Sequence, residues 1–169
     1  LLAFEKLTTV RKGRRRIVPD PPLIVRIDDD IGAAGGKVVE ACLDDYRQSL
    51  SLEHRQLFDR FTLIDIARKV VGVGSVGTRC LIALFQAGFG MPLLLRFKLA
   101  TTSVLETHLG ASAFSHAGRR VVEGQRLIQA TSDVLLGWAR WQEPRRRKVD
   151  FYVRQLWDGK GKIAVEGLG

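Results

Sequence analysis

The sequence predicts an α+β domain, in which N-terminal helices are followed by a twisted, mainly antiparallel sheet of about five strands with one packed helix. Two observations favour this class. Apolar residues recur at helical spacing over residues 37–50 and 118–130, whereas strand-like apolar segments gather in the second half of the chain. With 169 residues and 46% hydrophobic content, the chain is long enough to bury one core.

Residues 1–36 are expected to form an irregular N-terminal segment. Its prolines interrupt regular structure, and residues 23–27 are expected to form a short strand between them and the following loop. The acidic triplet at residues 28–30 lacks neighbouring ligands at fixed offsets, so a solvated turn is favoured over a cation site.

Residues 37–68 are expected to be helical, and residues 69–169 to form the sheet-bearing domain. The first helix covers about residues 37–50, and Ser51 is expected to cap a second helix that ends near residues 60–63. The chain then leads through Ile64, Ile66 and Val70 into a glycine-rich loop.

In the second half of the chain, residues 93–100 predict an apolar strand with the cation Lys98 in its interior. His108, Gly110 and His116 are expected in a loop before the helix at residues 118–130. Three further strands are predicted, at residues 133–141, 149–157 and 163–166, with a hairpin turn at 158–161. Residues 80–85 are apolar at successive positions, and periodicity alone does not separate a buried strand from a buried helix there.

The composition restricts the partners of the chain. Its net charge of +9 favours an anionic partner, whether nucleic acid, an acidic membrane surface or a phosphorylated metabolite. The basic clusters at residues 14–16 and 145–148 lack interleaved aromatic residues, which favours solvated loops over a nucleic-acid site. No apolar run has the length of a membrane-spanning helix.

Cys42 and Cys80 lie among apolar neighbours without metal-ligand spacing, so they are expected to be buried thiols of a cytoplasmic protein. The basic stretch that follows the apolar start is the reverse of the order in a signal peptide. The first residue is not Met, which we interpret as a sign of a truncated or processed chain.

Gly72, Gly74 and Gly77 form a glycine-spaced turn after β-branched residues, where backbone N–H groups can approach a phosphate. One interpretation is a dinucleotide fingerprint, with residues 78–86 as the following helix of a Rossmann-like module. The acidic residue expected at the end of the next strand is missing, because residues 93–98 contain no Asp or Glu.

In the other interpretation, residues 69–72 and 78–86 are antiparallel strands whose glycine-rich tip folds over the phosphates of ATP. The next strand would present Lys98 to the α- and β-phosphates, and Glu123 on the following helix would orient Lys98, as in protein kinases. Ser75 would either donate to a phosphate or fill the turn.

The same residues have simpler structural interpretations. Lys98 could be an edge-strand lysine that reaches solvent, and Glu123 could pair with arginines of its own helix: Arg119, Arg120 and Arg126. Arg154 is expected to pair with Asp133 across neighbouring strands, and no role is assigned to Gln155 or Lys160. The tryptophans are expected to be packing residues: Trp138, Trp141 and Trp157.

Five blocks of the sequence occur in a characteristic order, at residues 67–80 (ARKVVGVGSVGTRC), 103–106 (SVLE), 120–127 (RVVEGQRL), 132–138 and 151–156 (FYVRQL). This series resembles the uncharacterised bacterial family known as domain of unknown function 2252, over roughly residues 20–165. The resemblance implies a substantially longer protein. Its upstream part is similar to the catalytic loop of small-molecule kinases and is followed by an Asp-rich motif.

That order of motifs would imply a kinase-like fold permuted in chain order, with this chain as a fragment that holds the nucleotide-gripping lobe. The upstream catalytic half of the family would then be its partner. In one departure, the family tends to carry an acidic residue just after the Lys98 position, where this sequence has Leu99.

These patterns predict the ATP-binding lobe of a kinase-like bacterial protein, with a fold that resembles a kinase N-lobe. The nucleotide would be held by Gly72, Gly74, Ser75, Gly77, Lys98 and Glu123. Phosphoryl transfer and Mg²⁺ binding would need the missing part of the family, because this chain has no recognisable catalytic base or metal-binding carboxylate pair. The alternatives are a Rossmann-like dinucleotide module and a non-enzymatic basic domain whose anion binding falls steeply with salt. The sequence predicts neither an acceptor nor an oligomeric state.

Overall fold

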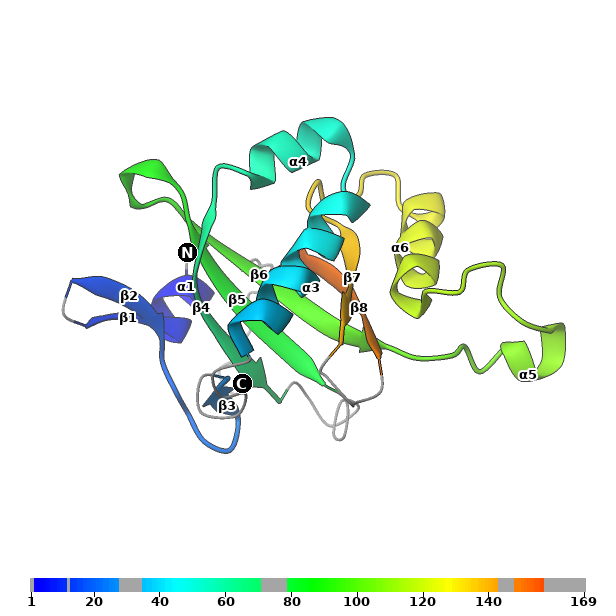
Figure 1. Ribbon diagram of the computed structural model, residues 1–169, viewed down its shortest axis with the longest axis horizontal. Helices are drawn as coiled ribbons and strands as arrows, with labels where there is room; N and C mark the ends of the chain where they lie inside the picture. The colour runs from blue at the N-terminus through cyan, green and yellow to red at the C-terminus, as the bar shows by residue number, and fades with distance from the viewer. Residues whose placement is uncertain (1, 12, 28–34, 71–78, 143–147, 157–169) are drawn as a thin grey trace, which may run out of the picture.

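A six-stranded antiparallel sheet with the strand order β3-β4-β5-β6-β8-β7 is the centre of the computed structural model (Figure 1). The structure describes residues 2–11, 13–27, 35–70, 79–142 and 148–156. The strands are β3 (Ile24–Arg26), β4 (Thr62–Lys69), β5 (Cys80–Gln86), β6 (Pro92–Ala100), β7 (Gly137–Trp141) and β8 (Val149–Gln155). The last strand of the described residues, β8, therefore lies between β6 and β7.

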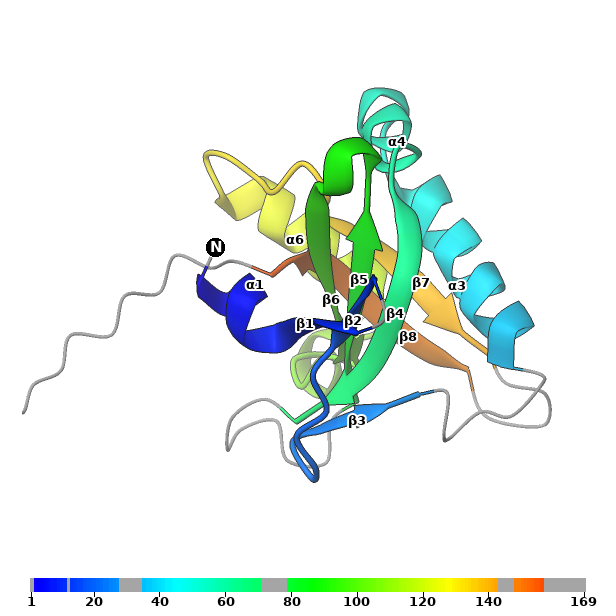
Figure 2. The same ribbon diagram turned by 90° about the vertical axis from the view of Figure 1, so that its left-hand side faces the viewer.

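Helices lie on both faces of this sheet. Figure 2 shows α3 on one side, and α1 and α6 on the other. The helices are α1 (Leu2–Leu7), α3 (Gly35–Ser49), α4 (Leu52–Phe58), α5 (Glu106–Leu109) and α6 (Ala117–Ile128), and a 3-10 turn, η3 (Gly88–Gly90), joins β5 to β6.

The larger part of the core lies between α3 and the sheet. Successive strand residues point to opposite faces, so one set of alternate positions in every long strand faces α3. Tyr46 of α3 is fully buried at the centre of this layer, with edge-on ring contacts to Phe58 at 5.0 Å and Phe97 at 6.0 Å between centroids. Its hydroxyl donates to the carbonyl of Leu135 at 2.7 Å, which ties α3 to the segment before β7.

A smaller core lies on the opposite face of the sheet, at its β3–β5 part. It is covered by α1 and by a separate hairpin of β1 (Thr8–Arg11) and β2 (Arg14–Ile17), whose Ile17 packs with Ile82. The buried Asp65 carboxylate accepts the Ile17 N–H at 2.9 Å and lies 3.5 Å from the guanidinium of Arg16, so it holds the hairpin on β4.

The N-terminal part of the chain differs from the irregular segment that its prolines predict. The strand expected at residues 23–27 is confirmed as β3, but α1 and the hairpin precede it. The prolines lie in the connection between β2 and β3, and Gly13, with φ of 73°, supplies the left-handed residue of the hairpin turn. The order of elements is thus helix, strands, helices and sheet, and one sheet runs through all three predicted sequence ranges.

The elements around the glycine-rich segment are strands. Cys80–Gln86 is β5 and pairs antiparallel with both β4 and β6, so the helix expected by the dinucleotide interpretation is wrong for these residues. β4 begins at Thr62, earlier than the strand expected at residues 69–72. The helices predicted at residues 37–50 and 118–130 are confirmed as α3 and α6.

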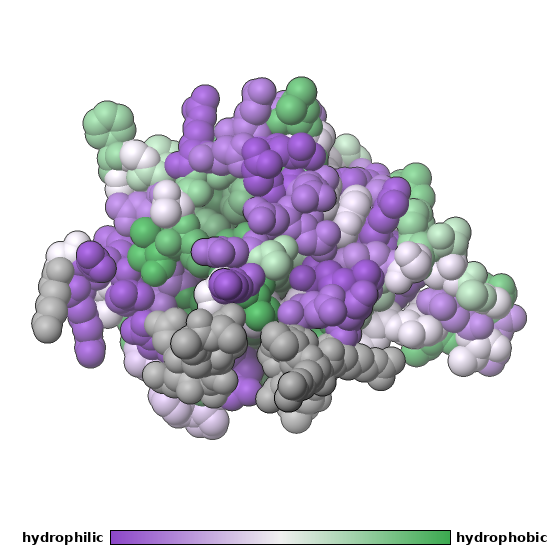
Figure 3. Space-filling model, viewed as in Figure 1, coloured by the Kyte–Doolittle hydropathy of each residue, from purple (hydrophilic) through white to green (hydrophobic). Residues whose placement is uncertain are grey.

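The surface over α3 is mostly hydrophilic, whereas hydrophobic atoms are visible both to the left of α3 and at the right-hand end of the molecule around α5 and α6 (Figure 3). Val104, Leu109, Leu127 and Ile128 are each about four-fifths exposed there. Among the described residues, no helix combines the length and the apolar character that a membrane crossing requires.

Candidate anion-binding site on the sheet

The structure describes the predicted lysine, Lys98, but not the predicted residues of the glycine-rich loop. Gly72, Gly74, Ser75 and Gly77 lie outside the described residues. The strands on either side of them are β4, which ends at Lys69, and β5, which begins at Cys80. Any statement about the loop itself therefore stays a prediction.

Lys98 lies in the interior of the sheet, not on an edge strand. It is directly opposite Cys80 of β5 on one side and Tyr152 of β8 on the other, and all three side chains share a face. Lys98 is half-buried and forms no ion pair with a carboxylate of the described residues. Lys98 therefore lies beside Cys80, the first residue of the strand that follows the glycine-rich segment.

Glu123 pairs within its own helix. Its carboxylate lies 3.8 Å from the guanidinium of Arg119 and 3.6 Å from that of Arg126, and no ion pair joins it to Lys98. α6 does pack against the Lys98 strand and its neighbour β8. A role of Glu123 in orienting Lys98 stays a prediction, and the pairing present here is the helical one.

Three further cations share the face of Lys98. Lys69 ends β4, and Arg96 and Arg154 lie directly opposite each other on β6 and β8. Alternation along the strands places all of them on the face opposite α3, because the residues between them, such as Phe97 and Val153, belong to the core on the α3 side. We call Lys69, Arg96, Lys98 and Arg154 the cation cluster.

Positive charges of the cation cluster influence the pKa of the Cys80 thiol and that of the Lys69 amine. Burial raises the pKa of the Cys80 thiol, although the positive charges of Arg96, Lys98 and Lys69 oppose that rise. Burial also lowers the pKa of Lys69; the nearby Cys80 opposes this shift, and the charge of Arg96 adds to it. These three cations therefore lie close enough to Cys80 to influence one buried group.

Arg96 has a polar atom that no described residue satisfies. Its Nε is buried and has no hydrogen-bond partner among the described residues. Buried polar atoms are satisfied in the great majority of cases, so an orphaned guanidinium nitrogen in a cluster of cations fits an anionic ligand. No group of His, Cys, Asp or Glu among the described residues is arranged to hold a metal ion.

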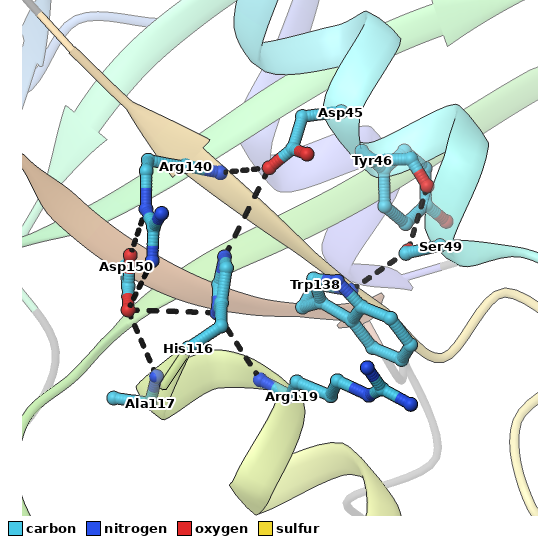
Figure 4. Close-up of polar contacts among 9 residues, drawn as sticks. All are labelled: Asp45, Tyr46, Ser49, His116, Ala117, Arg119, Trp138, Arg140 and Asp150. Carbon is cyan, nitrogen blue, oxygen red and sulfur yellow. Dashed lines mark hydrogen bonds and ion pairs between the residues drawn. The ribbon is translucent and has the colours of Figure 1, made fainter. Parts of the chain in front are cut away.

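A second polar cluster lies at the start of α6 (Figure 4). Asp150 of β8 accepts the Ala117 N–H at 2.8 Å and forms an ion pair with Arg140 of β7 at 2.6 Å. His116 accepts the Arg119 N–H at Nδ1, at 3.2 Å, so this cluster satisfies two N-terminal donors of the helix.

The environment of His116 is enclosed and polar. Its Nε2 is buried without a hydrogen-bond partner among the described residues and lies 3.9 Å from a carboxylate oxygen of Asp45 on α3. Burial lowers the pKa of His116; the carboxylates of Asp150 and Asp45 oppose the shift, and Arg140 adds to it. We interpret the cluster as a clamp that holds α6 on β7, β8 and α3.

The sequence of the chain matches one protein family over residues 2–169. That family is described as an uncharacterized protein conserved in bacteria, DUF2252. The chain belongs to the DUF2252 family. Searches of the curated proteins and of the solved structures returned no match.

In this DUF2252 chain, the sequence analysis singled out Lys98 but not the arginines that share its sheet face. Arg96 stands in the same predicted strand and could have been found, because two cations two positions apart in an apolar strand share a face. Arg154 joins them only through the pairing of β6 with β8, which the sequence does not reveal. The predicted pairing of Arg154 with Asp133 is wrong: Asp133 lies in the turn before β7, where its carboxylate accepts the N–H groups of Leu135 and Gln155.

Proposed function

We propose that this chain binds the phosphates of a nucleotide such as ATP beside Lys98. The observation that carries the proposal is the position of Lys98 opposite Cys80, which begins the strand after the glycine-rich segment. Lys98 lies among other cations and has no carboxylate partner in the described part of the chain. Such a site favours a multiply charged anion, because the field of several cations acts at short range in a partly desolvated place.

The order of the parts along the chain supports a kinase-like arrangement. A glycine-rich segment between two antiparallel strands, a lysine on the next strand and then a helix with a glutamate occur here in the order that protein kinases use. In this proposal Lys98 contacts the α- and β-phosphates, and Gly72, Gly74, Ser75 and Gly77 supply backbone and hydroxyl donors. Glu123 would orient Lys98 after exchanging its present arginine partners for the lysine.

The proposed activity of the chain is binding, and phosphoryl transfer belongs to the longer protein that the family resemblance implies. Transfer requires an Asp base and carboxylate ligands for Mg²⁺. The described residues include no group suited to a metal ion. We therefore propose an ATP-binding lobe whose Mg²⁺ ligands and base would come from another part of the protein.

Calorimetric titration with ATP–Mg²⁺ tests this proposal, at about 50 mM and about 200 mM salt. Lys98→Ala should weaken binding at least about tenfold, because it removes a charge-assisted contact worth about 1.5–3 kcal/mol. Arg14→Ala is the matched control, since Arg14 is an exposed cation at the turn of the β1–β2 hairpin.

Equal weakening by Lys98→Ala, Arg14→Ala and salt would contradict the nucleotide site. It would favour the second candidate, a basic domain that attracts anions through its net charge of +9. That candidate predicts a steep loss of affinity with salt and no particular dependence on Lys98.

A further inference from the structure

Arg96 and Arg154 form an unusual pair in the sheet. They are directly opposite each other on β6 and β8, where the side chains of paired residues point to the same face. Like charges in this position destabilise a sheet, and Lys98, two residues along β6 from Arg96, adds a third cation to the same face. The chain therefore holds positive charge together at a cost in stability.

No carboxylate of the described residues neutralises this pair. Arg96 Nε is buried without a partner, and neither arginine has an ion pair among the described residues. The neighbouring pair of strands, β7 and β8, shows that an arginine on this sheet can be paired: Arg140 of β7 contacts Asp150 of β8 at 2.6 Å. Within the described residues this half-buried arginine pair has no counter-ion, whereas the neighbouring Arg140 has one, and an external anion would supply it.

Guanidinium groups suit one class of counter-ion especially well. Their planar fork donates in parallel to two oxygens of a phosphate or carboxylate, which a lysine cannot do. In the kinase motif the residue two positions before the lysine is Ala, whereas this chain has Arg96 there. The sheet face that carries Lys98 can therefore neutralise more negative charge on a ligand than a single lysine could.

We infer that Arg96 and Arg154 bind a second anionic group, so that the ligand of this face is an oligophosphate held at two points, by Lys98 and by the arginine pair. The inference rests on the proposed function for the Lys98 contact only. The role of the arginine pair is supported independently, by two like charges that lie directly opposite each other and by the Arg96 Nε, which has no partner among the described residues.

The test compares orthophosphate, tripolyphosphate and ATP–Mg²⁺ by calorimetry on the full chain. The variants are Arg96→Gln, Arg154→Gln, Arg96→Lys and Lys98→Ala, with Arg14→Gln as the charge-matched control. We expect the wild type to bind tripolyphosphate at least about tenfold more tightly than orthophosphate, because two charged contacts replace one. Each Arg→Gln variant should lose most of that preference, and Arg96→Lys should recover only part of it because it restores the charge without the fork.

The outcomes separate this inference from the proposed function. If Lys98→Ala abolishes ATP binding while both Arg→Gln variants bind every probe like the wild type, the inference is overturned and the nucleotide site stands. If tripolyphosphate binding depends on both arginines but Lys98→Ala changes nothing, the second site stands and the Lys98 contact is lost. Absence of binding, or equal weakening by Arg14→Gln, overturns both.

Thermal unfolding without ligand gives an independent measurement. Arg96 and Arg154 are like charges that lie directly opposite each other, so removing one of them relieves their repulsion. Arg96→Gln and Arg154→Gln should therefore each raise the Tm of the free protein. A structural arginine behaves in the opposite way, since its loss removes contacts. A lower Tm for both variants would assign the pair a purely structural role and overturn the inference.

Discussion

Aspartates of this protein accept hydrogen bonds from backbone donors, whereas two buried side-chain nitrogen atoms have no hydrogen-bond partner among the described residues. Asp65, Asp133 and Asp150 each accept backbone N–H groups and so position a hairpin, a turn and a helix. Arg96 Nε and His116 Nε2 are the buried side-chain nitrogen atoms left without a partner among the described residues. Because satisfied groups dominate, these two atoms indicate where a ligand or a proton has an effect.

His116 should make stability depend on pH. Burial lowers its pKa from the ordinary 6.5, so the unfolded chain binds a proton more readily than the folded protein does. The stabilising contribution is fully present above about pH 6.5 and is lost as pH falls through the lower pKa of the folded state. Urea unfolding measured across this range should show a decline in the free energy of unfolding.

His116→Asn should flatten that decline, because Asn keeps an oxygen that can accept the Arg119 N–H but does not titrate. His108→Asn, in the exposed part of α5, serves as the control and should leave the profile unchanged. An identical pH profile for His116→Asn and the wild type would refute the assignment of this titration to His116.

Tyr46→Phe should destabilise the protein by about 1–3 kcal/mol, because it leaves the buried Leu135 carbonyl without its donor. Urea unfolding measures the change. Tyr152→Phe is the matched control, since Tyr152 is half-buried and its hydroxyl donates to no described residue. Similar effects of the two substitutions would mean that the hydrogen bond itself contributes little.

The arrangement of elements follows from local sequence only in part. The helical period of residues 37–50 and the apolar run at residues 93–100 predicted α3 and β6 correctly, because each pattern is set within one element. The choice of strand for residues 80–85 and the position of β8 between β6 and β7 depend on pairing across the sheet, which no local pattern encodes. For the same reason Lys98 could be singled out from sequence, whereas its opposition to Tyr152 and the Arg96–Arg154 pair could not.

The close approach of α6 to β8 predicts opposite effects for two glycines of one helix. A Cβ at Gly118 would meet the backbone carbonyl of Phe151, which cannot move without disturbing the strand, so Gly118→Ala should cost about 1–3 kcal/mol. A Cβ at Gly124 meets nothing within 4 Å. Gly124→Ala should therefore stabilise the helix by about 0.5–1 kcal/mol.

Thermal and urea unfolding of the two alanine variants provide the measurement, and each variant is the control for the other. Circular dichroism at low temperature would establish that both keep the wild-type helix content. The packing argument fails if Gly118→Ala is as stable as Gly124→Ala.

At the scale of the whole molecule, the two thiols should report global unfolding. Cys42 and Cys80 are each 2% exposed, and burial raises the pKa of Cys42 to about 12, with Asp45 adding to the rise. A thiol reagent at about pH 8 should therefore react with neither cysteine in the folded protein and with both after unfolding, because only the exposed thiolate is nucleophilic.

Labelling rates in low urea, followed by mass spectrometry, provide the measurement. Cys42→Ala isolates Cys80, and its labelling should follow the global free energy of unfolding. Reaction of Cys80 faster than unfolding would instead show that the start of β5 opens locally, without the rest of the sheet.

The cation cluster comes from strands that are far apart in the chain: Lys69 from β4, Arg96 and Lys98 from β6, and Arg154 from β8. An anion that contacts all of them cross-links these segments and binds only the assembled sheet, so it shifts the folding equilibrium by mass action. A hundredfold excess of free ligand over its Kd would add about 2.7 kcal/mol to the folded state. The phosphate compound that we propose as the ligand would then also act as a chemical chaperone for the protein, and the amount of folded chain in a cell would follow the supply of that compound.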